Sequence, residues 1–167
     1  IFTEFMEQRG PGHTVGSENI YLKGFREHKQ DIKEALDKLD YMNDPEAVDK
    51  EAELKGMDIA CDAIMLLASR YADLAEKMAA ECGDETRKAE LLQIAENCRV
   101  VPAERPRTYW QAIQMYWFAH LGVTSELNPW DSYSPGRLDQ HLIRFYRKDV
   151  GDGILDDYHA KELLECL

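Results

Sequence analysis

The sequence lacks the short motifs of several large enzyme classes. It contains no glycine-rich phosphate loop, no Gly-x-Ser-x-Gly nucleophile elbow and no His-Glu-x-x-His zinc motif. Its four cysteines lack the close spacing that metal and redox sites use. They are Cys61, Cys82, Cys98 and Cys166. We therefore expect free structural thiols in a reducing compartment, the cytoplasm, and neither a metal nor a directly bound cofactor.

A basic surface and a long apolar run are also missing. Of the 167 residues, 32 are Asp or Glu and 20 are Lys or Arg, which gives a net charge of −12. Phosphate backbones bind positive surfaces, so this balance disfavours nucleic acid as a partner. No run of about 18 apolar residues occurs, which disfavours a membrane-spanning helix. The amino end also lacks the charged and apolar regions of a signal peptide.

Both ends of the sequence resemble cuts through longer elements. It begins at Ile1 without a methionine, and residues 160–167 form an amphipathic pattern without a capping signal. We expect an excerpt of a longer protein, truncated at both ends. With 44% hydrophobic residues, residues 1–167 can bury one core and form part of a single domain.

Residues 1–8 are predicted to be the end of a helix that runs into a loop around His13. Three further helices are predicted before residue 100. Apolar residues at three- and four-residue steps predict the first over 21–39. The second begins with Asp44 as N-cap and Pro45 in its first turn, and it breaks near 82–85. The third passes through 91–95. The large side chains of the second helix that we expect to face the core are Ile64, Leu67, Tyr71, Leu74 and Met78.

The later part of the chain is predicted to be helical as well. Residues 100–106 are expected to be extended because they contain two prolines. Thr108 is then expected to cap a helix over 109–121 that is apolar nearly all round, as in a helix covered on every side, and Gly122 is expected to end it. The remaining predicted elements are a strand at 123–125, a helix at 137–150, a turn at 151–153 and a last helix. The predicted fold class is a mainly α-helical excerpt.

Two loops stand out as places that present side chains. Residues 9–16 hold three glycines and one proline around His13, which specifies a tight backbone path. Residues 126–137 crowd aromatic, acidic and hydroxyl groups between two prolines, with Asp131 beside Trp130. From the residues alone, His13 could bond backbone carbonyls or transfer protons. Asp131 could pair with a cation or close a turn.

The other histidines and Arg137 are expected to be structural. His120 lies in the apolar helix, where a hydrogen-bonded core histidine is the expectation. His28, His141 and His159 fit solvated or half-buried helix faces. Arg137 is expected to make local contacts only.

Three segments resemble the pyruvate formate-lyase-like glycyl radical enzymes. They are residues 7–14, 98–114 and 134–140. The resemblance extends over essentially the whole chain. Within the family, residues 126–131 (Glu-Leu-Asn-Pro-Trp-Asp) are most similar to the branch that dehydrates trans-4-hydroxy-L-proline. One departure is Gly10, where Ala is expected in the motif Arg-x-Pro-Gly-His-Thr.

The resemblance implies a radical reaction. In the family, a separate S-adenosylmethionine-dependent iron–sulfur activase installs a backbone glycyl radical, which passes to a cysteine. The resulting thiyl radical takes a hydrogen atom from the substrate, and in the dehydratases water then leaves. Neither a Cys-x-Glu motif nor the Arg-Val-x-Gly-Tyr glycyl motif occurs in this sequence. The resemblance further implies a homodimer and a parent ten-stranded α/β barrel, with these helices packed outside it.

The resemblance also implies roles for three residues in a small-molecule substrate pocket. His13 would hydrogen-bond the leaving hydroxyl and help to protonate it. Asp131 would pair with the ring ammonium of trans-4-hydroxy-L-proline, and Phe5 would pack on the pyrrolidine ring. The product would be pyrroline-5-carboxylate. The alternatives are a glycerol or diol dehydratase, a choline lyase, a formate acetyltransferase, or a non-catalytic helical scaffold.

Overall fold

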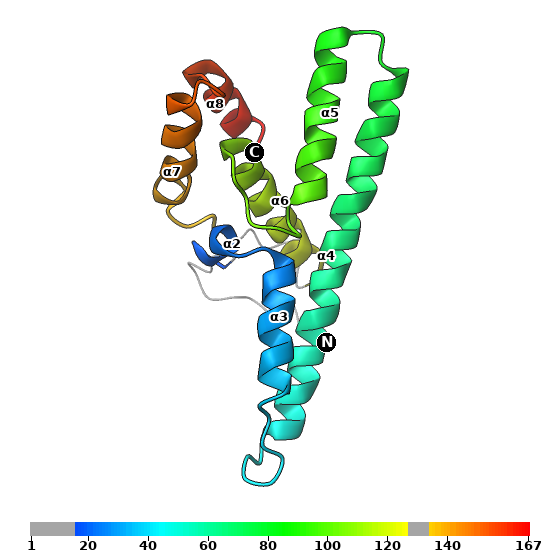
Figure 1. Cartoon of the computed structure of the whole chain (residues 1–167), viewed down its shortest axis with the longest axis vertical. Coiled ribbons are helices and arrows are strands. Elements are labelled where there is room, and N and C mark those ends of the chain that lie inside the picture. The colour runs from blue at the N-terminus through cyan, green and yellow to red at the C-terminus, as the bar shows by residue number, and fades with distance from the viewer. Residues whose placement is uncertain (1–15, 127–133) are drawn as a thin grey trace, which may run out of the picture. The chain divides into compact units, whose positions relative to one another are not determined.

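The computed structural model describes residues 16–126 and 134–167 (Figure 1). Helices account for most of these residues, and the described ranges contain no β-strand, so the predicted helical fold class is confirmed. The helices are α2 (Asn19–Leu22), α3 (Phe25–Leu36), α4 (Ala47–Glu81), α5 (Glu85–Val100), α6 (Tyr109–Glu126), α7 (Leu138–Gly151) and α8 (Asp157–Glu165). They form two compact units, one spanning Lys23–Pro106 and the other joining the segment up to Leu22 to Arg107–Leu167.

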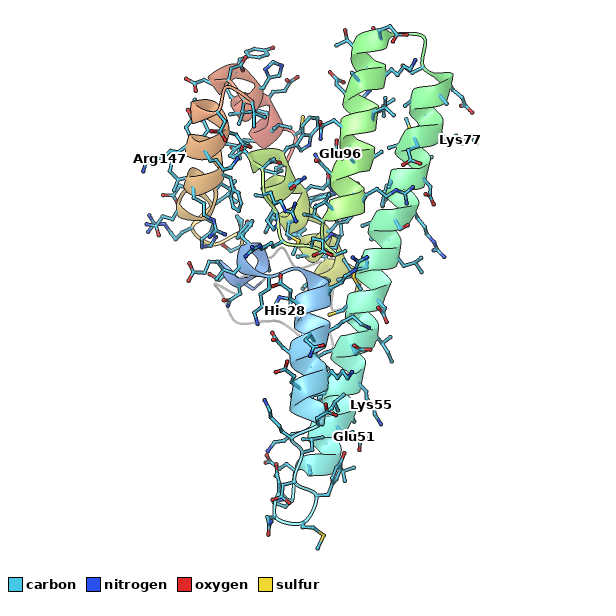
Figure 2. All side chains as sticks on the ribbon, viewed as in Figure 1. His28, Glu51, Lys55, Lys77, Glu96 and Arg147 are labelled. Carbon is cyan, nitrogen blue, oxygen red and sulfur yellow. The ribbon has the colours of Figure 1, made fainter. Side chains whose placement is uncertain are left out.

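The first unit is built along α4, against which both α3 and α5 pack (Figure 1). Lys29 of α3 reaches two carboxylates of α4, with Nζ 2.9 Å from Asp58 and 2.7 Å from Asp62. Arg99 of α5 pairs with Asp73 and Glu76 in the same way. The solvated faces carry local pairs too, such as Glu51 and Lys55, one turn apart on α4 (Figure 2). Because such exposed pairs contribute little, the apolar contacts hold this unit together.

The predicted inward face of α4 is wrong. Tyr71, Leu74 and Met78 are 47%, 49% and 46% exposed, and Ile64 and Leu67 are only half-buried. The buried face consists instead of small residues, namely Ala47, Ala68, Ala72, Ala75 and Ala79. Small side chains at a contact let two helix backbones approach closely, since the distance between helix axes depends on those side chains. The buried alanines and the large apolar side chains both recur at the helical period. Periodicity alone therefore could not show which of the two faces of α4 is buried.

Gly24 divides the predicted first helix into α2 and α3. Its backbone is extended and buried, and its N–H donates to Glu27 Oε2 at 3.0 Å. A Cβ at this position would lie 2.3 Å from the carbonyl oxygen of Ala103. Only glycine therefore allows this close approach of two backbones. The helix also ends at Leu36, short of the predicted Leu39.

The turn before α4 differs in detail from the prediction. The helix begins at Ala47, with Glu46 rather than Asp44 at the N-cap position, so Pro45 precedes the helix instead of lying in its first turn. The Asp44 carboxylate accepts a hydrogen bond of 2.9 Å from the backbone N of Glu46, so it stabilises the turn that leads into the helix. The predicted break near 82–85 is confirmed, since α4 ends at Glu81 and Asp84 caps α5.

The segment after α5 is extended only in part, because residues 101–104 form a turn and only 105–107 lie outside turn and helix. The backbone N of Val101 donates to Asn97 O at 2.8 Å, and that of Glu104 donates to Val100 O at 2.8 Å. The prolines remain compatible with this turn because neither has to donate a hydrogen bond.

The second unit surrounds α6, which begins as predicted and ends later. Thr108 Oγ1 accepts a hydrogen bond of 3.2 Å from Gln111 N, so the predicted cap is confirmed. The predicted end at Gly122 and strand at 123–125 are wrong, because the helix runs on to Glu126. A glycine inside a helix costs only about 1 kcal/mol. The hydroxyl of Thr124 donates back to His120 O at 2.9 Å within the same helix.

The predicted helix at 137–150, the turn after it and the last helix are present in this unit, with Gly151 as the last residue of α7 rather than part of the turn. Leu142 and Phe145 of α7 are buried, Gly153 lies in the turn with a φ of +71°, and α8 follows. The four cysteines are free thiols, as expected. None of the helices in the described ranges combines the length and hydropathy that crossing a bilayer requires.

We predict that Gly24→Ala destabilises the intact protein by about 1–3 kcal/mol, because the added Cβ overlaps the backbone of residues 103 and 104. Gly56→Ala is the matched control, since a Cβ there meets no atom within 4 Å on α4. Replacing that helical glycine should raise stability by about 0.5–1 kcal/mol. Thermal melting of the two variants tests this, and equal melting temperatures would contradict the close approach at Gly24.

We predict that Cys98 reacts slowly with iodoacetamide in the native protein at pH 8. The side chain is buried, and burial raises the pKa of its thiol to about 11, so very little reactive thiolate exists at that pH. Unfolding in urea should accelerate its labelling on the order of 100-fold. Peptide mass spectrometry measures both rates, and fast labelling of the native thiol would contradict the packing of α5.

Candidate functional site

The three residues that the sequence assigns to a substrate pocket lie outside the described residues. These are Phe5, which precedes the first loop in the predicted helix end at 1–8, His13 of the first loop, and Asp131 of the second. Their roles therefore stay predictions. The structure does describe the segments that flank both loops, and these segments show how the chain on either side of the loops is held by the helices.

The segment that follows His13 is anchored in a core within a few residues. Gly16 has a φ of +65°, which favours glycine, and its carbonyl accepts a hydrogen bond of 3.1 Å from Asn19 N. The short helix α2 then buries Ile20 and Tyr21, which are 7% and 2% exposed. The chain that leaves the first loop is thus fixed by apolar burial rather than by surface contacts.

The second loop lies between the end of α6 and the start of α7. On the α7 side, Ser134 Oγ accepts a hydrogen bond of 3.1 Å from Gly136 N, and Gly136 has a φ of +70°. Arg137 Nε lies 3.3 Å from Asp139 Oδ1, both exposed, so Arg137 makes the local contact expected of it. These contacts define the conformation of the backbone immediately before α7 and in its first turn.

The flanks of both loops share one hydrophobic core. Its buried members are Ile20, Tyr21, Tyr109, Ala112, Ile113, Tyr116, Ala119, Leu142, Phe145 and Ala160. They come from α2, α6, α7 and α8. Arg144 of α7 adds a polar tie, since its Nη2 donates to Tyr21 O at 3.1 Å. The residues after His13 and those on either side of 127–133 therefore belong to one packed unit.

A buried carboxylate fixes the start of α6. Asp149 of α7 is 2% exposed, and its Oδ2 accepts a hydrogen bond of 2.7 Å from Tyr109 N. A negative charge at a helix N-terminus is favourable, because the first backbone N–H groups are unpaired and the helix dipole is positive there. This cap was not predicted from the sequence. A usable signal existed, because Asp149 continues the spacing of the buried Leu142 and Phe145.

The histidines of the described residues lie where expected. His120 is half-buried, with Nδ1 3.2 Å from the Tyr116 hydroxyl and its ring stacked on Trp117 at 5.8 Å between centroids, so its predicted hydrogen bond is confirmed. Burial raises the pKa of Tyr116, which therefore stays a neutral phenol. His159 is exposed, whereas His28 on α3 (Figure 2) and His141 on α7 are half-buried. Within the described ranges, no group of three His, Cys, Asp or Glu side chains is suited to a metal ion.

The pyruvate formate lyase-like family model matches residues 1–167 of the chain. The chain belongs to this family. The family resemblance found in the sequence is therefore confirmed, and the two flanked loops are parts of a pyruvate formate lyase-like protein.

Two curated relatives of this family member differ clearly in similarity. The trans-4-hydroxy-L-proline dehydratase of Clostridioides difficile is 60% identical over 100% of this chain, which covers 21% of that protein. The isethionate sulfite-lyase of Bilophila wadsworthia is 39% identical over 90% of this chain, which covers 18% of that protein. The chain thus spans about a fifth of the length of the relatives that it matches.

Solved structures of the family show the same difference in sequence identity as the curated relatives. The hydroxyproline dehydratase HypD of Clostridioides difficile, with trans-4-hydroxy-L-proline bound, matches with a TM-score of 0.90 and 59% identity. That match covers 97% of this chain and 20% of the HypD chain. The glycerol-bound B12-independent glycerol dehydratase of Clostridium butyricum matches with a TM-score of 0.84 and 33% identity, over 93% of this chain and 19% of that one. The helical arrangement is common to both, while the sequence is nearer to HypD.

We predict that Asp149→Ala destabilises the intact protein by about 1–3 kcal/mol, because it leaves the buried backbone N–H of Tyr109 without its acceptor. Asp149→Asn should cost less, since an amide oxygen can still accept that hydrogen bond. Asp152→Ala is the control, because Asp152 is exposed and pairs only with the exposed Lys148. Equal losses of melting temperature for Asp149→Ala and Asp152→Ala would argue against the cap.

Proposed function

We propose that the intact protein is a glycyl radical lyase that eliminates water from trans-4-hydroxy-L-proline to give pyrroline-5-carboxylate. The observation that carries this proposal is the 60% identity, over the whole chain, to a trans-4-hydroxy-L-proline dehydratase. The isethionate sulfite-lyase is 39% identical and the glycerol dehydratase structure 33% identical. A gap of this size favours the same substrate as the first relative over the substrates of the others.

His13 and Asp131 supply the polar chemistry of the proposed reaction. The C4 hydroxyl of the substrate is a poor leaving group until it gains a proton, and an imidazolium is able to give one near neutral pH. The secondary ammonium of the ring is a cation, which a carboxylate such as Asp131 binds by a charge-assisted hydrogen bond. Phe5 offers an apolar face to the ring carbons. These residues together distinguish a cyclic amino acid from a neutral polyol.

The radical part of the reaction requires groups beyond these residues. A glycyl radical, installed by an S-adenosylmethionine-dependent iron–sulfur activase, would supply the hydrogen-atom abstraction by way of a cysteine thiyl radical. Residues 1–167 contribute the helical amino-terminal region of a pyruvate formate-lyase domain, and their part is to bind and orient the substrate and to exclude water. We propose that the whole protein is a cytoplasmic homodimer. In each subunit these helices would pack outside a ten-stranded α/β barrel.

A glycerol or diol dehydratase is the second candidate. It is favoured by the glycerol dehydratase structure and by a 1,2-propanediol-dehydrating protein of Roseburia inulinivorans, which matches with a TM-score of 0.86 and 33% identity. The two candidates differ in the charge of the substrate. Asp131 therefore discriminates between them, because a neutral polyol offers no cation to a carboxylate.

The proposal is tested by anaerobic turnover of the intact, activase-treated protein. We predict dehydration of trans-4-hydroxy-L-proline and no turnover of glycerol, with the glycyl radical quantified by electron paramagnetic resonance. A full radical signal with glycerol alone consumed would overturn the substrate and favour the second candidate. A full radical signal with neither substrate consumed would overturn both dehydratases.

We predict that Asp131→Asn lowers kcat/KM for trans-4-hydroxy-L-proline on the order of 100-fold, because the ammonium loses its charged partner. His13→Ala should lower kcat on the order of 10²- to 10⁴-fold, as loss of a general acid does. Asp139→Ala is the control, since that exposed carboxylate pairs locally with Arg137 and should leave turnover unchanged. If both site variants kept full turnover at equal radical content, the non-catalytic scaffold would be the better account.

A further inference from the structure

Two buried polar atoms where α2 meets α7 have no hydrogen-bond partner among the described residues. One is the hydroxyl of Tyr21, a side chain that is only 2% exposed, and the other is Nδ1 of His141. The two rings lie side by side, with centroids 5.6 Å apart and a tilt of 48° between their planes. Buried polar groups are almost always paired with protein or with ordered water. Because the two rings are adjacent, one small molecule that reaches both atoms is the simplest partner for the pair.

The surroundings of the pair are apolar or already bonded. Phe145 packs against Tyr21 with ring centroids 6.2 Å apart. The guanidinium of Arg144 donates to the backbone oxygen of Tyr21, at 3.1 Å, rather than to its hydroxyl. The Tyr116 hydroxyl on α6 lies 3.2 Å from His120 Nδ1. The neighbours thus have contacts of their own.

The chemistry of the two atoms selects the class of ligand. A phenol O–H donates, and an imidazole nitrogen that carries no proton accepts, so a small neutral molecule that both accepts and donates satisfies both. A metal ion would need more ligands than these two, and no suitable cluster occurs in the described residues. An anion would need a positive donor, and Arg144 is directed to a backbone carbonyl instead. Water has the right size and both functions.

We propose that Tyr21 and His141 together bind one buried water molecule at the contact between α2 and α7. The water accepts from the Tyr21 hydroxyl and donates to Nδ1 of His141, which places the ring proton of that histidine on Nε2. Tyr21 follows His13 by eight residues, and His141 follows Asp131 by ten. The water site therefore adds a polar link between the flanks of the two loops. It goes beyond the proposed function, because it does not depend on the substrate.

The test is a crystal structure of the intact wild-type protein at a resolution that shows ordered water. The expected result is a density peak at about 2.7–3.2 Å from both the Tyr21 hydroxyl and His141 Nδ1. A direct hydrogen bond between the two side chains would overturn the proposal, and so would a protein group bonded to either atom in place of water. Two unpartnered atoms without a peak would overturn it as well.

Matched variants of the same protein give a second test. Tyr21→Phe keeps the ring and removes the hydrogen-bond donor, so the water peak should disappear. The backbone amide at position 21 should then exchange with deuterium several-fold faster, because the contact between α2 and α7 has lost its water-mediated link. His141→Asn keeps a polar group near Nδ1 and should retain the peak. Tyr146→Phe is the control, since its hydroxyl donates to Asp157 at 2.7 Å in the same unit and its loss should change neither readout. A peak that persists in Tyr21→Phe would show that the water belongs to other groups.

Discussion

Burial of Ile20 and Tyr21 against α6 and α7 is the interaction on which the candidate site depends. A loop with three glycines loses much conformational entropy when it is ordered, and its own sequence offers only the small apolar area of Pro11 and Val15 to offset that cost. The next element along the chain offers more, because two of the four residues of α2 are buried in a shared core. The helices that flank the second loop use the same core. One set of apolar contacts therefore anchors both flanks.

Polar contacts refine this arrangement rather than create it. Asp149 joins the end of α7 to the start of α6, and Arg144 joins α7 to the backbone of α2. The proposed water between Tyr21 and His141 acts at the same contact. Each of these hydrogen bonds is directional. Each therefore selects one packing register among the many that purely apolar contacts would allow. The proposed pocket, which would orient a small cyclic amino acid, would need that selection.

The sequence predicted most of the helices, because their periodicity, breaks and caps are local properties. Thr108 is a cap that the sequence predicted, and Asp84, which caps α5, lies in the predicted break at 82–85. The errors arose where contacts with a segment distant in the sequence determine the local structure or the buried face. Gly24 interrupts a helical pattern because the backbone at Ala103 passes too close for a side chain, and α4 buries its alanines because α5 approaches it closely. Residues 123–125 continue a helix that their local glycine and β-branched residues argued against.

The site itself was predicted by motif rather than by physics. Gly-Pro-Gly-His alone is compatible with a structural histidine, and Asp131 alone with a turn. The family match supports the proposed roles of both residues, and the shared core anchors the described segments that flank their loops. The measurement that tests this account most directly is a crystal structure of the intact protein with trans-4-hydroxy-L-proline bound. We predict His13 within hydrogen-bond distance of the C4 hydroxyl and Asp131 within hydrogen-bond distance of the ring nitrogen. A substrate bound with neither residue in contact would contradict the account.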